Sequence, residues 1–384
     1  MSAVKNGTGK RRSNRPAFLS SQAVFLALCL AFSLPARANI YEWEYVDPLD
    51  PSQGKQQSAV LTPGGSGVNA VPSANLSSLN LTMGYFISAD LTGASFLAST
   101  LTNADLSSAT LTNANLGNAT INGAVFDGTA FTKEQLYSTA SYASGNLTGV
   151  GLSGNDLDGW NFAGQNLTSS NFTSVNLTNA NLANANFTSA TFVGSDLSKA
   201  DARGATGMTY TDAAQRSNFI RPDGIVEGLS LGAGETMRIW DDQAASPPNI
   251  LVQTGFVMDG SSTLLLVFED ADWGSLIQMG AGITVTLGGT LELGLGTGVT
   301  PADIGGVGKT FHLFDWTAAS AVNGQFSQIL LSGDYQGYSW DTGNLYTAGT
   351  ITMVSIPEPG ALSLAALGIA LCGGGAIRRR ARRS

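Results

Sequence analysis

Large apolar residues return at every fifth position over a long central stretch of the chain, from Asn75 to Ala205. The first run has thirteen such sites without a gap: Leu76, Leu81, Phe86, Leu91, Phe96, Leu101, Leu106, Leu111, Leu116, Ile121, Phe126, Phe131 and Leu136. A second run adds eleven more: Leu147, Leu152, Leu157, Phe162, Leu167, Phe172, Leu177, Leu182, Phe187, Phe192 and Leu197. Repetition of this regularity predicts a solenoid, in which stacked repeats share one interior.

A period of five fits neither a straight helix nor a straight strand. A helix advances about 100° per residue, so every fifth side chain leaves the first face, and in a strand every fifth side chain changes sides. The chain must therefore turn by about a quarter circle per repeat, so that four repeats close one coil of twenty residues. The twenty-four pentads predict about six coils with Leu and Phe inside, stacked over roughly 29 Å.

The remaining positions of the repeat carry small and turn-forming residues. An alanine often stands two positions before the apolar site, as at Ala89, Ala94, Ala104, Ala109, Ala114, Ala119, Ala124, Ala180, Ala185 and Ala190. Asn, Asp, Ser, Thr and Gly fill the other places, and they favour turns and bond to nearby backbone. This pattern resembles the A-(D/N)-L-x-x motif of the pentapeptide-repeat family. The resemblance implies that residues 74–205 form a right-handed quadrilateral β-helix.

An interruption separates the two runs. Thr132 is followed three residues later by Gln135, which is a capping-box pattern, and Leu147 comes one residue late for the five-residue phase. We predict a short helical turn that bulges from the wall at residues 132–146. Glu134 and Trp160 stand where a small residue is usual, and we expect the wall to open there.

The first 73 residues are predicted to hold a leader and a cap. Residues 1–38 combine a basic start, a short apolar run and an A-x-A site at Ala36 and Ala38, which together indicate a cleaved export signal. Within residues 39–73, aromatic residues alternate with glutamates in a strand suited to cover the end of a solenoid. Residues 47–72 are rich in Pro, Gly, Gln and Ser and predict a linker.

The repeat stops after Ala205, and residues 206–356 change character. Short apolar runs alternate there with Gly, Asp, Asn and Ser, which predicts an all-β domain. A sandwich-like arrangement and an irregular continuation of the solenoid both satisfy this pattern.

The last segment, residues 357–384, has a composite order. Pro357, Glu358 and Pro359 precede an apolar stretch at 361–377, which is long enough for a transmembrane helix. Arginines follow it: Arg378, Arg379, Arg380, Arg382 and Arg383. The segment resembles the PEP-CTERM sorting signal, which implies an exosortase-type processing enzyme, transient residence in the inner membrane, and display at the cell surface or release. A plain tail anchor is the alternative.

The net charge argues against nucleic acid as a binding partner, and the positions of the cysteines argue against disulfides. Without the two terminal segments, the chain keeps 8 basic and 27 acidic residues, a net charge of −19 that repels nucleic acid. Both cysteines, Cys29 and Cys372, lie in the terminal segments, so we expect neither disulfides nor thiol chemistry in the mature protein.

Few residues suggest catalysis. His312 is the single histidine, in a predicted strand, so no Ser-His-Asp set and no His-rich metal site can be assembled. We predict no enzymatic activity and no cofactor. Weak calcium candidates stand at predicted strand ends, where they fit solubilising turns equally well: Asp241, Asp242, Glu269, Asp270 and Asp272.

These observations favour an exported structural or adhesive protein of the cell envelope or matrix. The alternative is a protein that binds carbohydrate or an exopolysaccharide matrix through Asn and Thr ladders and four tryptophans, Trp240, Trp273, Trp316 and Trp340. A third class is the DNA-mimicking pentapeptide protein that binds topoisomerase. The export leader and the charge of the shaft, eight acids against three bases in residues 74–205, disfavour it.

Overall fold

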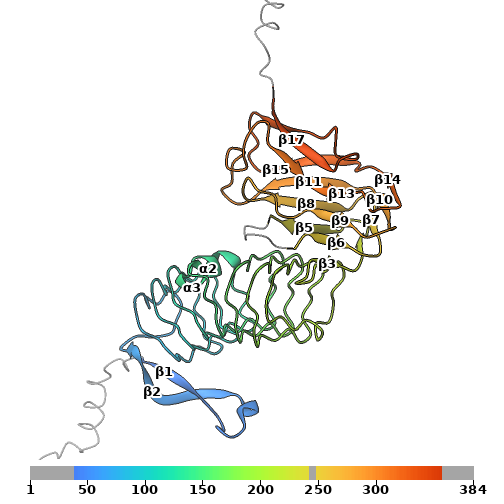
Figure 1. Ribbon diagram of the computed structural model, residues 1–384. Helices are drawn as coiled ribbons and strands as arrows, with labels where there is room; N and C mark the ends of the chain where they lie inside the picture. The colour runs from blue at the N-terminus through green and yellow to red at the C-terminus, as the bar shows by residue number, and fades with distance from the viewer. Residues whose placement is uncertain (1–38, 242–247, 357–384) are drawn as a thin grey trace, which may run out of the picture.

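The computed structural model describes residues 39–241 and 248–356, which form two solenoids (Figure 1). One hydrophobic core runs from Ile40 to Phe219, and a second runs from Ile220 to Met353. The predicted leader, with Ala36 and Ala38, and the predicted sorting segment at 357–384 lie outside the described residues. Within the described ranges, no helix has the length and apolar character needed to cross a membrane.

The first solenoid, which we call the shaft, stacks its chain with the repeat that the sequence predicts. Parallel bridges join residues twenty apart, such as Asn75 with Ser95 and Ser95 with Asn115. All twenty-four Leu, Ile and Phe sites of the two runs are buried, and none is more than 5% exposed. The predicted interior is therefore confirmed. The ring of Phe172 stacks on that of Phe192, with centroids 5.2 Å apart and planes 4° apart.

Each pentad turns because its polar residues hold a local turn. In one pentad, Ala94 N donates to Leu91 O at 2.9 Å, and Gly93 between them has a φ of +67°. Asp90 Oδ1 accepts from Thr92 N at 3.1 Å and fixes the start of the same turn. Asn, Ser and Gly recur at the place of Gly93, because the left-handed region costs them least. The quarter turn is therefore encoded within each five-residue unit.

The interruption forms two short helices, α2 (Lys133–Tyr137) and α3 (Ala140–Ala143). The predicted capping box between Thr132 and Gln135 is present. The segment is part of the wall and does not merely protrude, because Leu136 is fully buried and Gln135 Nε2 donates to two carbonyls of the preceding coil. The next bridge, from Val125 to Gly151, spans twenty-six residues instead of twenty, so this coil is wider.

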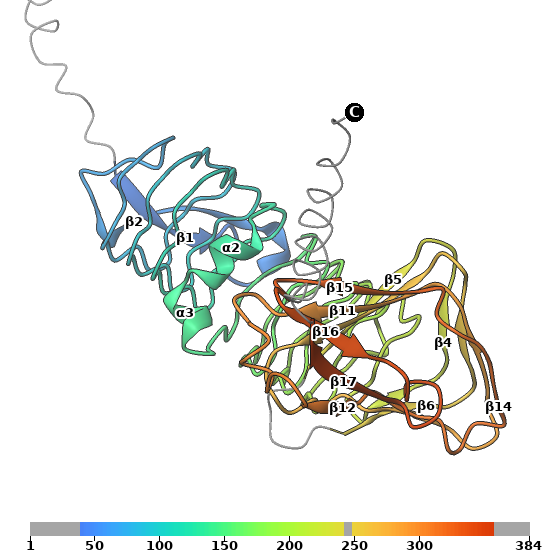
Figure 2. The same ribbon diagram turned by 90° about the horizontal axis from the view of Figure 1, so that it is seen from above.

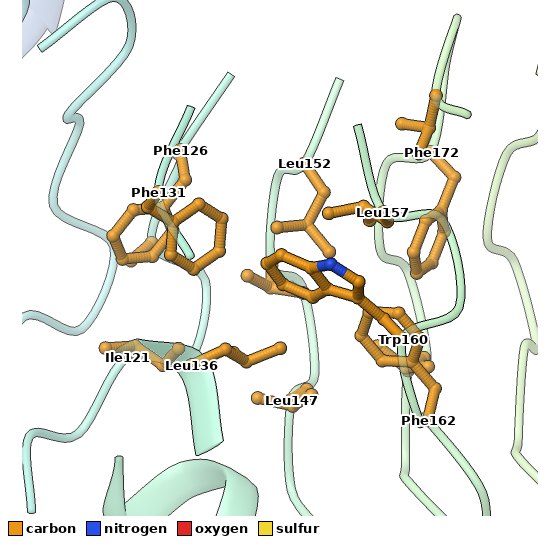
Figure 3. Packing of buried hydrophobic residues seen from close by; sticks show 14 of the residues in the cluster. Ile121, Phe126, Phe131, Leu136, Leu147, Leu152, Leu157, Trp160, Phe162 and Phe172 are labelled. Atoms are coloured by element: carbon orange, nitrogen blue, oxygen red, sulfur yellow. The ribbon is translucent and has the colours of Figure 1, made fainter. Parts of the chain in front are cut away.

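The wider coil accommodates Trp160. We expected the wall to open at this residue, but its side chain is inside and only 6% exposed (Figure 3). The indole packs against Phe131, Tyr137 and Phe162, with ring centroids 5.5, 6.3 and 6.2 Å away. Glu134, the other unusual residue, lies exposed on α2.

A hairpin covers the first coil. Strand β1 (Asn39–Tyr45) pairs antiparallel with β2 (Lys55–Ser66), and a 3-10 turn η1 (Pro51–Gln53) lies between them. Trp43 N donates to Met83 O, and Tyr85 N donates to Tyr41 O, both at 2.8 Å. These bonds satisfy edge groups that no earlier coil could satisfy, so the predicted cap is present. Much of the predicted linker is strand β2, whose polar residues suit an exposed edge.

The second solenoid has three parallel sheets, seen as three sides in Figure 2. The first contains β3 (Ile225–Val226), β6 (Ile250–Val252), β9 (Ile277–Met279) and β13 (Phe314–Asp315). The second contains β4 (Leu229–Leu231), β7 (Phe256–Met258), β10 (Thr284–Leu287) and β14 (Ala321–Gly324). The third contains β5 (Thr236–Trp240), β8 (Thr263–Phe268), β11 (Thr290–Leu295) and β15 (Gln328–Ser332).

Of the two architectures that the sequence left open, the structure has the irregular solenoid. Its strands alternate buried and exposed residues, as in β10, where Val285 and Leu287 point inward and the threonines outward. Strand β12 (Thr310–His312), just before the last coil, forms an antiparallel sheet with β17 (Thr350–Ser355) and β16 (Tyr338–Asp341), which come after that coil. The shaft also extends beyond its predicted end at Ala205, because Asp201 still bridges to Ile220.

Candidate functional site

A buried ion pair joins the two solenoids. Asp201 and Arg203 lie on the last part of the shaft with fully buried side chains, and Arg203 Nη2 is 2.7 Å from Asp201 Oδ2. The same nitrogen donates to Ser275 Oγ at 2.7 Å and to Trp240 O at 3.1 Å, both in the second solenoid. Hydrogen bonds between charged groups are shorter and stronger than those between neutral groups, and Arg203 makes such bonds to Asp201 through both Nε and Nη2. Arg203 therefore fixes the second solenoid to the shaft.

Other polar contacts surround this pair. Lys199 Nζ lies 2.8 Å from Glu235 Oε1. Asn218 exchanges two hydrogen bonds with the backbone of Ser230, at 2.9 and 2.7 Å. Hydrogen bonds are directional, so several of them restrict rotation of the second solenoid against the shaft more than an apolar contact of equal size would. We therefore treat the contact between the two solenoids as a fixed joint.

A cleft of about 660 Å³ lies beside the joint, between the shaft and the second solenoid. Its floor is the outer face of one parallel sheet, where Trp240, Val267, Gly294 and Ser332 pair in register across β5, β8, β11 and β15. Its opposite wall consists of α2, α3 and Asn161 of the shaft. In Figure 1 the two helices lie on the side of the shaft that faces the second solenoid.

Two stacked tyrosines form the shaft wall of the cleft. The rings of Tyr137 and Tyr142 have centroids 4.5 Å apart. Tyr137 Oη accepts from Asn161 N at 2.6 Å, and Tyr142 Oη donates to Asn161 O at 2.9 Å. Burial raises the pKa of both phenols above the ordinary value of 10.0, so both stay neutral at physiological pH. The rings are therefore held in place by the backbone of the next coil.

Opposite the tyrosines, strand β5 of the floor carries a cation beside an aromatic ring. The guanidinium carbon of Arg238 lies 5.3 Å from the ring centroid of Trp240. Asn179 of the shaft accepts from Arg238 N at 3.2 Å and from Trp240 Nε1 at 3.5 Å. The charged residues lining the cleft are two bases and two acids, Lys133, Arg238, Glu134 and Glu269.

A comparison with protein families agrees with the repeat of the shaft. The family profile described as pentapeptide repeats matches in eight copies, over residues 73–107, 99–133, 146–182 and 170–206. The shaft is built of pentapeptide repeats. Among solved structures, the chain is similar to HetL, a pentapeptide repeat protein involved in heterocyst differentiation regulation from the cyanobacterium Nostoc sp. strain PCC 7120. That match has 24% identity and a TM-score of 0.15, and it covers 39% of this chain and 69% of HetL. Curated proteins gave no match.

The carboxylate candidates for calcium have other roles in the structure. Asp241 is buried, and it accepts from Gly274 N at 3.0 Å and from Glu269 N at 3.4 Å. Burial raises its pKa to about 6. This carboxylate holds the turn between β8 and β9, while the side chain of Glu269 lines the cleft.

The neighbouring acids are turn residues. Asp270 Oδ1 accepts from Asp272 N at 2.7 Å, and Asp272 lies 3.3 Å from Lys309 Nζ. Asp242 lies outside the described residues. Within residues 39–241 and 248–356, no group of three or more His, Cys, Asp or Glu side chains could hold a metal ion.

Only one of the four candidate tryptophans lines the cleft. Trp316 and Trp340 are 8% exposed and belong to the core of the second solenoid, and Trp273 packs on Phe268 with centroids 4.8 Å apart. The prediction of a stacking face is therefore wrong for Trp316 and Trp340, because both rings are part of the core. Trp240 is the exception.

The Asn and Thr ladders of the pentapeptide shaft are largely engaged in their own turns. Asn166 Oδ1 accepts from both N and Oγ1 of Thr168, at 3.2 and 2.7 Å, and Asn176 binds Thr178 in the same way. Acceptors used in this way are less available to an external ligand. The cleft is thus a better candidate site than the open faces of the shaft.

Sequence reasoning missed most of the cleft. The capping box and the unusual Trp160 did mark the part of the wall where Tyr137 and Tyr142 lie. No signal in the sequence placed Arg238 and Trp240 opposite them, because that depends on the angle at which the second solenoid leaves the shaft.

Proposed function

We propose that this protein is an exported, non-catalytic structural protein that acts as a rigid two-part spacer at the cell surface or in the extracellular matrix. The observation that carries the proposal is the buried contact of Asp201 and Arg203 with Ser275 across the joint. Bending at this point would break charged hydrogen bonds in a dry environment, which is costly. The shaft and the second solenoid should therefore keep one fixed angle between them.

The construction of each solenoid supports this role. Each has one continuous core, and each is followed or preceded by an antiparallel element that covers an end. In detail, we propose that the shaft is a right-handed quadrilateral β-helix of about six coils, as the family resemblance implies. Covered ends prevent the open edges from pairing with other chains.

The sequence supports the export part of the proposal. A leader with Ala36 and Ala38, a body without cysteine, and the order Pro357-Glu358-Pro359 before 361–377 suit delivery through the inner membrane. An exosortase-type enzyme would process the C-terminal signal, so that membrane anchoring is transient.

A distance measurement tests the rigid joint. Spin labels at Thr112→Cys and Thr286→Cys, in the full chain with Cys29→Ser and Cys372→Ser, place one probe on each solenoid at exposed positions. A single narrow distance distribution by pulsed electron resonance supports the spacer. A broad or multimodal distribution in the folded protein would overturn it.

A further inference from the structure

We propose that the cleft between the pentapeptide shaft and the second solenoid binds a neutral oligosaccharide, as a short segment of an uncharged glycan. This inference goes beyond the spacer role because it assigns a ligand to the cleft, and it shares with that role the fixed angle of the joint, on which the position of the two walls depends. It rests on the shape of the cleft, on its aromatic walls and on its balance of charge.

The shape of the cleft suits a ligand that fits between two walls. Its volume of about 660 Å³ lies within the range of roughly 300–1,000 Å³ found for small-ligand sites. On its floor, Trp240, Val267, Gly294 and Ser332 lie in one row across four stacked strands. A ligand lying along this row would have the sheet on one side and α2 and α3 on the other.

The aromatic walls suit the faces of sugar rings. Tyr137 and Tyr142 stand on the shaft side, and Trp240 stands on the other side. Sugar rings carry C–H groups on their faces, which pack against aromatic rings, while their hydroxyls point outward around the edge. Lys133 and Arg238 offer donors to such hydroxyls, and Glu134 offers acceptors.

The charges select against ionic ligands. Two bases and two acids line the cleft, so its own charge is close to zero. The body around it carries −19 by the count of residues 39–356, which repels polyanions such as acidic polysaccharides or nucleic acid. A neutral polyhydroxyl ligand places no like charge against any of these groups.

The site is also pre-organised. Both tyrosine hydroxyls bond to the backbone of Asn161, and the strand that carries Arg238 and Trp240 bonds to Asn179. Side chains that are already fixed lose little conformational entropy when a ligand binds. Each wall is thus tied to the shaft, and the two walls keep their separation.

Titration of the full-length protein with cellotetraose, laminaritetraose, maltotetraose and tetragalacturonate tests the proposal. Calorimetry and Trp fluorescence should show saturable binding of at least one neutral probe, and no binding of tetragalacturonate. We expect Tyr137→Ala to weaken the binding about tenfold or more. The matched control is Tyr210→Ala, because Tyr210 is a half-buried tyrosine that lines a different cleft of about 560 Å³.

A second variant guards against a loss of fold. The double variant Lys133→Ala with Glu134→Ala removes two exposed side chains that line the cleft, so the packing of both solenoids is unchanged. It should weaken binding about fivefold or more while the melting temperature stays near that of the parent. The proposal fails if no neutral probe binds up to about 10 mM, if this double variant binds as the parent does, or if only tetragalacturonate binds. The spin-label distances, which report the joint, are unaffected by any of these results.

Discussion

Arg203 lies two residues beyond Asp201 on the shaft and, from the same guanidinium nitrogen, donates to Ser275 at 2.7 Å in the second solenoid. A charge pair that stabilises the last coil thereby also sets the direction of the next domain. The cleft beside it depends on that direction, because Trp240 O accepts from the same Arg203 nitrogen at 3.1 Å.

Replacing one member of this ion pair should lower the free energy of unfolding more than replacing both members does. Arg203→Met leaves the carboxylate of Asp201 buried without a partner, and we expect a loss of about 3–5 kcal/mol in the free energy of unfolding. The double variant Asp201→Asn with Arg203→Met should recover part of that loss. Chemical denaturation measures both. A double variant that is less stable than Arg203→Met would contradict the ion-pair account.

Substitutions at two neighbouring residues of the shaft, one inside and one outside, should differ sharply in their effect on stability. Leu111 is 2% exposed, whereas the side chain of Thr112 is exposed. Leu111→Asp buries a charge between stacked coils and should prevent folding or lower the melting temperature severely. Thr112→Asp should change the free energy of unfolding by less than about 0.5 kcal/mol. Equal damage from the two substitutions would contradict the square coil.

The helical insertion should contribute to stability. Gln135→Ala removes the donor to Leu111 O and Ala114 O together with half of the capping box, so we expect a loss of about 1–3 kcal/mol. Lys133→Ala, on the exposed start of the same helix, should be nearly neutral. Urea denaturation of the two variants decides whether the segment is wall or a dispensable bulge, and a silent Gln135→Ala would favour the bulge.

Asp241 predicts a dependence of stability on pH. Its pKa is about 6 in the folded protein against 3.8 for the ordinary group, because burial disfavours the charged form. The folded state therefore binds more protons than the unfolded state between these values, and stability falls as pH rises through them, by up to about 3 kcal/mol. Above the folded pKa no further loss comes from this group.

Denaturation at several pH values between 4 and 7 measures this slope. Asp241→Asn cannot ionise, so the difference in unfolding free energy between it and the parent should change over this range and level off above it. A constant difference would show that Asp241 does not titrate as described.

Processing at the C-terminal signal predicts a defined product. Mass spectrometry of the protein recovered from the cell surface should find a C-terminus near residues 356–359. Replacing Pro357, Glu358 and Pro359 with alanines should prevent that cleavage. An intact C-terminus at Ser384 in the surface protein would instead establish a permanent anchor.

The sequence by itself determined the shaft. Its turn is local: Asp90 binds Thr92, Gly93 takes the left-handed conformation, and the next apolar residue follows within the same five positions. Because each unit repeats the same short-range bonds, the period, the buried ladder and the coil length follow from the order of residues alone. The capping box was predictable for the same reason, whereas the sequence analysis predicted a linker where β2 of the hairpin lies.

The tertiary structure decided the joint, the cleft and the position of Trp160, because each depends on contacts between residues far apart in the sequence. Arg203 meets Ser275 across 72 residues, and Tyr137 faces Trp240 across more than a hundred. Trp160 lies inside only because α2 and α3 widen the coil next to it. The sequence also did not separate the buried Trp316 and Trp340 from Trp240, which lines the cleft, since burial here depends on packing against distant residues. Contacts of this kind arise from how two rigid bodies pack, and no local pattern of residues encodes that geometry.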